Sequence, residues 1–249
     1  MQCDDFFLNH LNTAIQTSLQ QRDELKVFLH IPKTAGSSVQ RDLQCEFPDN
    51  HHIPTPQLEE RWDQFIALAN YQDIHHVRGH ITHQHLLKLD QKRIPFQVIS
   101  YLRHPLHRLK SHFNWVHTSI DPKFLKSTPS SSFREFAQGR MENYLTNRLV
   151  GPCESAEEAL QKIKRRYWFV GLAEYYHLCQ GVLMKAMGRN YRIRPPKNQT
   201  TQKMPSVQLE LDRELLEELQ DGMKIDFAVF EYFRSAWEKK INEACELLF

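Results

Sequence analysis

The stretch at 27–44, VFLHIPKTAGSSVQRDLQ, constrains the fold more than any other part of the chain. Residues 27–31 form a compact apolar run that is typical of a buried strand, and Pro32 ends it. After Ser37 the apolar residues recur at every fourth position, which predicts a helix that ends before Pro48. The helix carries Val39, Leu43 and Phe47 on one face. A strand, a short Gly/Ser loop and a helix in this order are typical of anion-binding turns.

The rest of the chain alternates in the same way between strand-like and helical stretches. Further strands are predicted at 74–79, 95–102 and 167–172. Helices are predicted at 56–70, 82–89, 105–118, 133–149, 155–166, 174–187, 207–220 and 224–246. Residues 49–56 and 119–132 are rich in turn formers and are predicted to be loops. This alternation predicts an α/β fold with a mainly parallel β-sheet flanked by helices, in one domain over 1–249 with an N-terminal helical extension at 1–25.

Composition excludes several classes of protein. The net charge of only +2 gives no general basic field, so we expect no nucleic-acid partner. The five cysteines are widely spaced and form no CxxC pair, which favours a reduced, cytoplasmic setting over a disulfide framework. The N-terminus has no apolar signal-peptide core, and no window approaches the roughly 20 apolar residues that span a bilayer. We therefore expect a soluble protein with no membrane partner.

The loop after the first strand has the composition of a phosphate or sulfate site. Gly36 allows close backbone approach, Ser37 and Ser38 offer hydroxyl groups, and Lys33 offers an ammonium group. The lysine precedes the glycine, however, and the nucleotide-kinase pattern GxxxxGK[ST] is absent. A plain strand-to-helix turn with an exposed lysine remains the alternative.

A second anion-binding pair follows the strand at 95–102. Arg103 lies where that strand ends, and Ser111 lies two turns into the next helix. Arginine and a hydroxyl group can hold a phosphate through charge-assisted hydrogen bonds. Taken alone, the pattern fits equally well an arginine that caps the sheet edge and a serine on a helix face, neither of which binds an anion.

Together, HIPKTAGSS and LRHPLHRLKS resemble the two donor-binding signatures of carbohydrate sulfotransferases related to heparan sulfate 2-O- and 6-O-sulfotransferases, sulfotransferase family 2. These enzymes use 3′-phosphoadenosine 5′-phosphosulfate (PAPS) on a P-loop-NTPase-like core. The similarity runs from about 26 to 243 and includes ENYLTNRLVG at 142–151. One departure is Ala35, where many members have a second glycine.

The resemblance implies roles for individual residues. It implies that the first loop binds the 5′-phosphosulfate through Lys33, Thr34, Ala35, Gly36, Ser37 and Ser38. It implies that Arg103 and Ser111, eight positions apart as in the family, bind the 3′-phosphate. A late Lys/Thr-rich loop often closes the nucleotide site, which would make Lys197 and Thr200 donor contacts.

The general base is assigned to His80. The family places its catalytic histidine after a strand in a Gly-His context, and Gly79-His80 matches this pattern. Histidine can be tuned near neutral pH, while Lys33 would stabilise charge on the leaving oxygen. A zinc site in the histidine-rich stretch at 75–85 is an alternative, but no cysteine or carboxylate is spaced to complete it, so no metal is expected. His76 and His83 are candidates for assisting in the acceptor site.

Two further groups of residues leave alternatives open. The basic stretch at 189–203 could bind the donor, bind an acidic glycan, or be a solvated surface loop. The basic residues of this stretch are Arg189, Arg192, Arg194, Lys197 and Lys203. The tryptophans Trp115, Trp168 and Trp237 fall at positions predicted to pack in the core.

The sequence therefore predicts a PAPS-dependent sulfotransferase that acts on a hydroxyl group of a saccharide or another small hydroxylated acceptor. A nucleotide-dependent phosphotransferase is the alternative among enzymes. A non-catalytic homologue that binds nucleotide is the alternative outside them. The acceptor, the position sulfated and the oligomeric state do not follow from the sequence.

Overall fold

The computed structural model describes residues 25–48, 50–54, 57–67, 74, 76–118, 132–140, 142–195 and 212–248. Its centre is a five-stranded sheet in the order β2-β3-β1-β4-β5, in which every neighbouring pair is parallel. The strands are β1 (Leu25–Leu29), β2 (Asn50–Ile53), β3 (His76–Gly79), β4 (Phe96–Leu102) and β5 (Tyr167–Leu172). The expected α/β class, with a strand–loop–helix unit at the centre of a parallel sheet, is confirmed.

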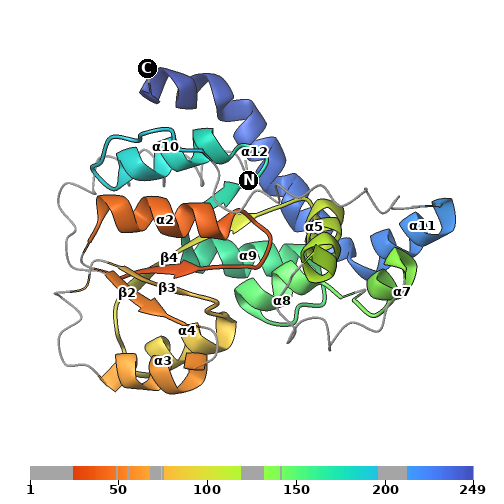
Figure 1. Ribbon diagram of the computed structural model, residues 1–249, viewed down its shortest axis with the longest axis horizontal. Helices are drawn as coiled ribbons and strands as arrows, with labels where there is room; N and C mark the ends of the chain where they lie inside the picture. Colours follow the sequence, from red (N-terminus) through yellow and green to blue (C-terminus); the bar gives the residue numbers. More distant parts are fainter. Residues whose placement is uncertain are drawn as a thin grey trace.

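Helices cover both faces of this sheet. In Figure 1, α2 and α10 lie above the strands, and α3 and α4 lie below them. The helices are α2 (Gly36–Glu46), α3 (Leu58–Ala67), α4 (His83–Gln91), α5 (Pro105–Thr118), α7 (Phe133–Gln138), α8 (Tyr144–Val150), α9 (Ala156–Arg166), α10 (Tyr176–Ala186), α11 (Arg213–Gly222) and α12 (Lys224–Leu248). The long α12 contacts α8, α9, α10 and β5, so the end of the chain packs along the β5 side of the sheet.

Most predicted elements are present, with shifted ends. The prediction of a loop over 49–56 was wrong for Asn50–Ile53, which forms β2 at the edge of the sheet. This strand pairs only with β3, and its short NHHI sequence has no apolar alternation that could predict it. The first strand lies at 25–29 rather than 27–31. Ser155 caps the helix that follows it, since its side chain accepts a hydrogen bond from the Glu158 N–H at 3.2 Å.

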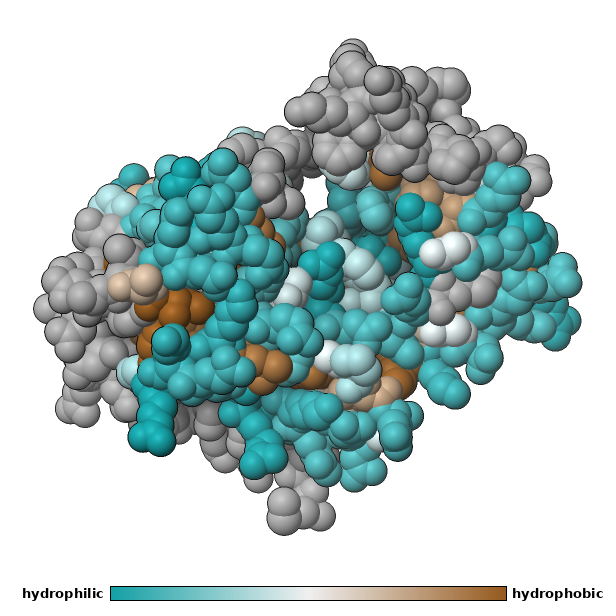
Figure 2. All heavy atoms as spheres, turned by 90° about the horizontal axis from the view of Figure 1, so that it is seen from below, coloured by the Kyte–Doolittle hydropathy of each residue, from teal (hydrophilic) through white to brown (hydrophobic). Residues whose placement is uncertain are grey.

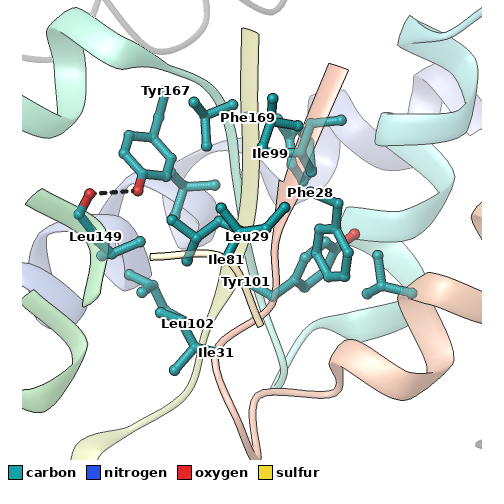
Figure 3. Close-up of a cluster of buried hydrophobic side chains, with 14 of the residues drawn as sticks. Phe28, Leu29, Ile31, Ile81, Ile99, Tyr101, Leu102, Leu149, Tyr167 and Phe169 are labelled. Carbon is teal, nitrogen blue, oxygen red and sulfur yellow. Dashed lines mark hydrogen bonds between the residues drawn. The ribbon is translucent and has the colours of Figure 1, made fainter. Parts of the chain in front are cut away.

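The main hydrophobic core lies on both faces of β1, β4 and β5. Figure 3 shows it with Tyr167, which donates a hydrogen bond to the Leu149 carbonyl group at 2.8 Å. Ile31, Ile81 and Leu102 follow or end the three central strands and are no more than 1% exposed. These three side chains anchor the strand ends, so the loops that follow start from fixed positions.

A second cluster of buried residues joins α5, α7 and α11. It contains Leu109, Phe113, Val116, Phe133, Phe136, Ala137, Leu215, Leu219 and Met223. The apolar face of α5 packs into this cluster, which leaves another face of the helix turned elsewhere. The polar residues Arg108, Ser111 and His112 lie on that other face.

Across the described residues, few large hydrophobic side chains lie on the surface. Figure 2, viewed from the side of α3 and α4, shows a mainly hydrophilic face with hydrophobic residues in small groups. In the described part of the chain, the large hydrophobic residues that are exposed are Trp115 and Ile193. None of the described helices is both long enough and apolar enough to cross a bilayer.

Candidate functional site

The register of the sheet brings three loops together at its carboxyl edge. Leu29 of β1 is level with Gly79 of β3 and with Ser100 of β4. The residues that follow therefore emerge side by side, and the His30 N–H continues the ladder to the Gly79 carbonyl group at 3.1 Å. Ligands in parallel α/β sheets bind at this edge, where strand ends meet helix N-termini.

The loop after β1 is a tight turn that leads directly into α2. The Thr34 hydroxyl group donates to the Ile31 carbonyl group at 2.9 Å, so it closes the turn and Thr34 faces a ligand only through its backbone. Lys33 and Ala35 both have left-handed backbone conformations, with φ of 72° and 67°. A left-handed turn followed by a helix N-terminus directs N–H groups toward one point, and this makes an anion-binding concavity.

The His30 ring packs directly against Gly36 and leaves no room for a side chain there. A Cβ atom at this position would lie 1.8 Å from Cδ2 and 2.0 Å from Nε2 of His30. The His30 ring thus fills the space that any larger residue would need. Gly36 is required here for packing against a histidine, while the left-handed positions of the turn are Lys33 and Ala35.

Lys33 and Arg103 meet at the mouth of the turn. Arg103 Nη1 donates a hydrogen bond to the Lys33 carbonyl group at 3.2 Å, which ties the loop after β4 to the loop after β1. Burial and the neighbouring Arg103 charge lower the pKa of the Lys33 ammonium group. Burial lowers the pKa of Arg103 as well, and the Glu174 carboxylate opposes that shift. Two partly buried cations held together at a helix N-terminus are typical of a site that binds an anionic ligand.

His80 lies beside this loop in a defined orientation. Its Nδ1 is 3.2 Å from the His30 carbonyl oxygen, which can only accept, so Nδ1 carries the proton and Nε2 has the free lone pair. Burial lowers the pKa of His80; the hydrogen bond to His30 opposes this shift, and the positive charge of Arg148 adds to it. His80 is therefore neutral near pH 7 and able to accept a proton at Nε2.

One face of α5 adds polar side chains to the site. At 100° per residue, Ser111 shares this face with Arg108, His112 and Trp115. The Lys33 ammonium group lies 5.6 Å from the centre of the Trp115 ring. The expectation that Trp115 packs in the core was wrong, since it is 36% exposed and lies at the mouth of the site. Trp237 is buried as expected, at 2% exposure.

Arginines from α5 and α8 complete the basic lining. The guanidinium carbons of Arg108 and Arg148 lie 4.2 Å and 5.2 Å from the centre of the Tyr144 ring. Arg108 is only 2% exposed, and its Nη1 has no hydrogen-bond partner in the described part of the chain. Burial lowers the pKa of His112 to about 4, with Arg108, Arg140 and Lys33 adding to the effect. The positive charges thus extend from Lys33 to α8.

His76, His83 and His85, from the same histidine-rich stretch, lie away from the site. His76 begins β3, at the opposite end of the strand from the site, and is buried. The His83 ring packs over Gly151, and His85 is buried in α4, where it accepts at 3.2 Å from the Thr82 N–H. Within the described residues, no group of three or more His, Cys, Asp or Glu side chains is placed to hold a metal ion.

The start of the basic stretch at 189–203 is bound to α2 by ion pairs. Arg194 pairs with Glu46 at 2.6 Å and lies 3.8 Å from the buried carboxylate of Asp42. Arg189 donates to the Glu46 carbonyl group at 3.4 Å. These two arginines are therefore held by the protein itself. Lys197, Thr200 and Lys203 lie outside the described residues.

Sequence reasoning missed several residues of the site. His30, Arg108, His112, Tyr144 and Arg148 were not assigned a role, although a signal for some was present. Arg108, Ser111 and His112 share a helix face that their spacing could have indicated. His30 and Arg148 had no such signal, because their place in the site depends on sheet register and on the packing of α8.

Comparisons with known proteins give little direct guidance. No protein-family model matches the chain, and no curated protein matches it. Among solved structures, a mouse sulfotransferase, SULT7A1, complexed with PAP is 12% identical; the alignment covers 86% of this chain and 70% of that chain, with a TM-score of 0.44. A likeness of this size is too weak to assign a function.

Proposed function

We propose that this protein is a PAPS-dependent sulfotransferase that transfers a sulfuryl group to a hydroxyl group of a saccharide or another small hydroxylated acceptor. The observation that carries the proposal is the meeting of Lys33, Arg103 and His80 at one edge of the sheet. Arg103 donates a hydrogen bond to the Lys33 carbonyl group. His80 donates one to the carbonyl group of His30, which lies three residues before Lys33. The resemblance of HIPKTAGSS and LRHPLHRLKS to the donor signatures of that family supports it.

Each residue has a role in this proposal. The α2 N-terminus, with Ala35, Gly36, Ser37 and Ser38, would hold the 5′-phosphosulfate, and Arg103 with Ser111 would hold the 3′-phosphate. The donor supplies the sulfuryl group and a leaving phosphate oxygen. His80 Nε2 would take the proton of the acceptor hydroxyl group, and Lys33 would stabilise negative charge on the leaving oxygen. Lys197 and Thr200 stay candidate donor contacts.

The reaction would follow the logic of in-line phosphoryl transfer, in which positioning and charge stabilisation do most of the catalysis. The lining is suited to this task because it combines fixed cations with the neutral imidazole of His80, whose Nε2 is free to accept a proton. We propose no metal in the reaction, and we propose a cytoplasmic location from the sequence composition. The four described cysteines, Cys45, Cys153, Cys179 and Cys245, are free thiols, which fits a reducing compartment.

Calorimetry with two nucleotides tests the donor site. Adenosine 3′,5′-bisphosphate and adenosine 5′-monophosphate are titrated into the wild type and into Arg103→Ala. We expect the bisphosphate to bind at least tenfold more tightly, a gap of about 1.4 kcal/mol. Arg103→Ala should remove this gap. Lys110→Ala, which removes a neighbouring charge on another face of α5, serves as the control and should keep it.

Equal binding of the two nucleotides to the wild type would refute the donor assignment. In that case ATP with Mg²⁺ becomes the next ligand, as expected for a phosphotransferase. If the gap is present, transfer of ³⁵S from labelled PAPS to a panel of saccharides tests turnover. Binding without transfer to any acceptor, unchanged in His80→Gln, would indicate a non-catalytic homologue.

A further inference from the structure

His30 lies between the end of β1 and the anion-binding turn, and its ring contacts the proposed base. Its side chain is 8% exposed and lies on the same face of the sheet as Phe28, Arg78 and His80. The ring is stacked on His80, with centroids 4.4 Å apart and an angle of 22° between the planes. Register makes this contact unavoidable, because Leu29 and Gly79 are paired and the next residues are His30 and His80.

The His30 ring is itself held from three directions. Gln40 on α2 lies with Nε2 3.3 Å from His30 Nδ1, and an amide N–H can only donate, so Nδ1 accepts. The Cδ2 and Nε2 edge fills the space over Gly36. Phe28 lies nearly parallel, with ring centroids 5.9 Å apart. A ring with so many contacts has one orientation.

The chemistry of His30 does not suit a role as an acid or base. Burial lowers its pKa to about 3, with the charges of His80, Lys33 and His52 adding to the effect. His30 therefore stays neutral. It contacts His80 through one face of its ring, and its main-chain carbonyl group fixes the His80 tautomer.

We propose that His30 is a positioning residue: its ring, oriented by Gln40 and seated against Gly36, holds the His80 imidazole in the plane in which Nε2 can accept a proton. This inference rests on the proposed function for the role of His80 as base. It connects the donor loop and the base through one side chain, since an edge of His30 contacts Gly36 and its face contacts His80. A loop that holds the donor correctly would then also hold the base correctly.

Four variants separate positioning from packing. His30→Ala removes the ring, and His30→Phe keeps a flat ring that cannot accept from Gln40. Gln40→Leu removes the orienting amide without touching His80. Gln44→Leu is the matched control, because Gln44 lies one turn further along α2 and accepts instead from Arg78 at 3.1 Å.

The first readout is the side-chain ¹H–¹⁵N spectrum of His80, with its signals identified by their loss in His80→Gln. In the wild type we expect one tautomer with the proton on Nδ1. His30→Ala should shift and broaden these signals, Gln40→Leu should change them in the same direction, and Gln44→Leu should leave them in place. Unchanged His80 signals in His30→Ala would overturn the proposal.

The second readout is kinetic. We expect His30→Ala to lower kcat at least tenfold while the Kd for adenosine 3′,5′-bisphosphate stays within threefold. His30→Phe should recover only part of the loss, because its ring is flat but is not oriented by Gln40. A fall in nucleotide affinity that matches the fall in kcat would show that His30 only supports the donor loop, and would overturn the proposal. If the wild type binds no bisphosphate, the proposed function fails, while the His80 spectra still decide whether His30 positions the ring.

Discussion

The main-chain carbonyl group of Lys33 accepts a hydrogen bond from Arg103 Nη1 at 3.2 Å, across 70 residues of sequence. This bond joins the two stretches that the sequence analysis singled out separately. It also gives Arg103 two tasks in the proposed site: binding the 3′-phosphate and holding the loop that binds the 5′ group. Ser111, two turns further along α5, has only the first task.

These two tasks predict different losses in two variants. Ser111→Ala should weaken binding of adenosine 3′,5′-bisphosphate by about tenfold and leave adenosine 5′-monophosphate unaffected, since a hydrogen bond to a charged group contributes about 1.5–3 kcal/mol. Arg103→Ala should weaken both nucleotides because the loop loses its support. Calorimetry on the two variants measures this. Equal effects of Arg103→Ala and Ser111→Ala on the monophosphate would contradict the second task of Arg103.

Ala35→Gly should stabilise the protein. Ala35 has a φ of 67°, and the left-handed conformation costs a non-glycine residue about 1–2 kcal/mol. Glycine relieves that strain, but it also raises the entropy of the unfolded chain, which costs about 0.4–1 kcal/mol of stability. The net gain is therefore about 0–1.6 kcal/mol. Urea unfolding gives the difference.

The control for this prediction is Ala228→Gly, the same chemical change at an exposed position inside α12. It should destabilise the protein by about 1 kcal/mol, the ordinary cost of glycine in a helix. If both variants lose stability equally, the backbone at Ala35 carries no strain.

Gly36→Ala should destabilise the protein through a clash with His30. The new Cβ atom would lie 1.8 Å from the ring, and overpacking of this kind costs about 1–3 kcal/mol. His30→Ala in the same chain should remove most of that cost, so the double variant should be less destabilised than the sum of the two single ones. Urea unfolding of all three tests the coupling.

Gly139→Ala is the matched control, because its Cβ atom would come no closer than 3.7 Å to another atom, the Glu135 carbonyl oxygen. We expect this variant to unfold within about 0.5 kcal/mol of the wild type, as for surface substitutions in general. Additive losses in the Gly36 and His30 double variant would show that the ring is not what Gly36 accommodates.

The pH dependence of the proposed reaction should follow His80. Burial and Arg148 lower its pKa, so kcat/KM should rise with pH to a midpoint below 6.5, where the imidazole loses its proton, and stay level at neutral pH. Arg148→Met removes a positive charge that disfavours the imidazolium form. The pKa of His80 should therefore rise, and the acid limb of the profile should move to higher pH.

Arg140→Met is the control for that shift, because Arg140 acts on His112 and is not among the groups that shift His80. The neutral His30 ring faces His80 in both variants, and so does His52 on β2, whose pKa His80 helps to lower. An acid limb that moves equally in both arginine variants would assign the titration to another group.

Much of the fold could be predicted from local patterns. The strand at 95–102 and the helix at 105–118 were placed within one residue, because each has a clear period and a proline or cap at its end. β2 could not be predicted, since a short edge strand such as NHHI forms through pairing with β3 and not through its own propensity.

The candidate site was predicted in part for the same reason. Lys33, Arg103 and His80 follow strand ends, and strand ends of a parallel sheet share one edge, so local elements were enough to bring them together. The prediction that Trp115 packs in the core was wrong, because helical spacing shows which face of a helix a residue lies on but not whether another element packs against that face. Arg194 could not be assigned, because its pairing with Glu46 joins segments 148 residues apart.

The sequence by itself determined most of the segments that become strands and helices, and the polar residues that follow the ends of the central strands, because period, proline and capping act over a few residues. Only the tertiary structure decided how those residues are used. Register set His30 against His80, packing against that ring explains Gly36, and the left-handed turn falls on Ala35. These are contacts between distant segments, and no local pattern encodes the distance between two side chains that meet only when the sheet has formed.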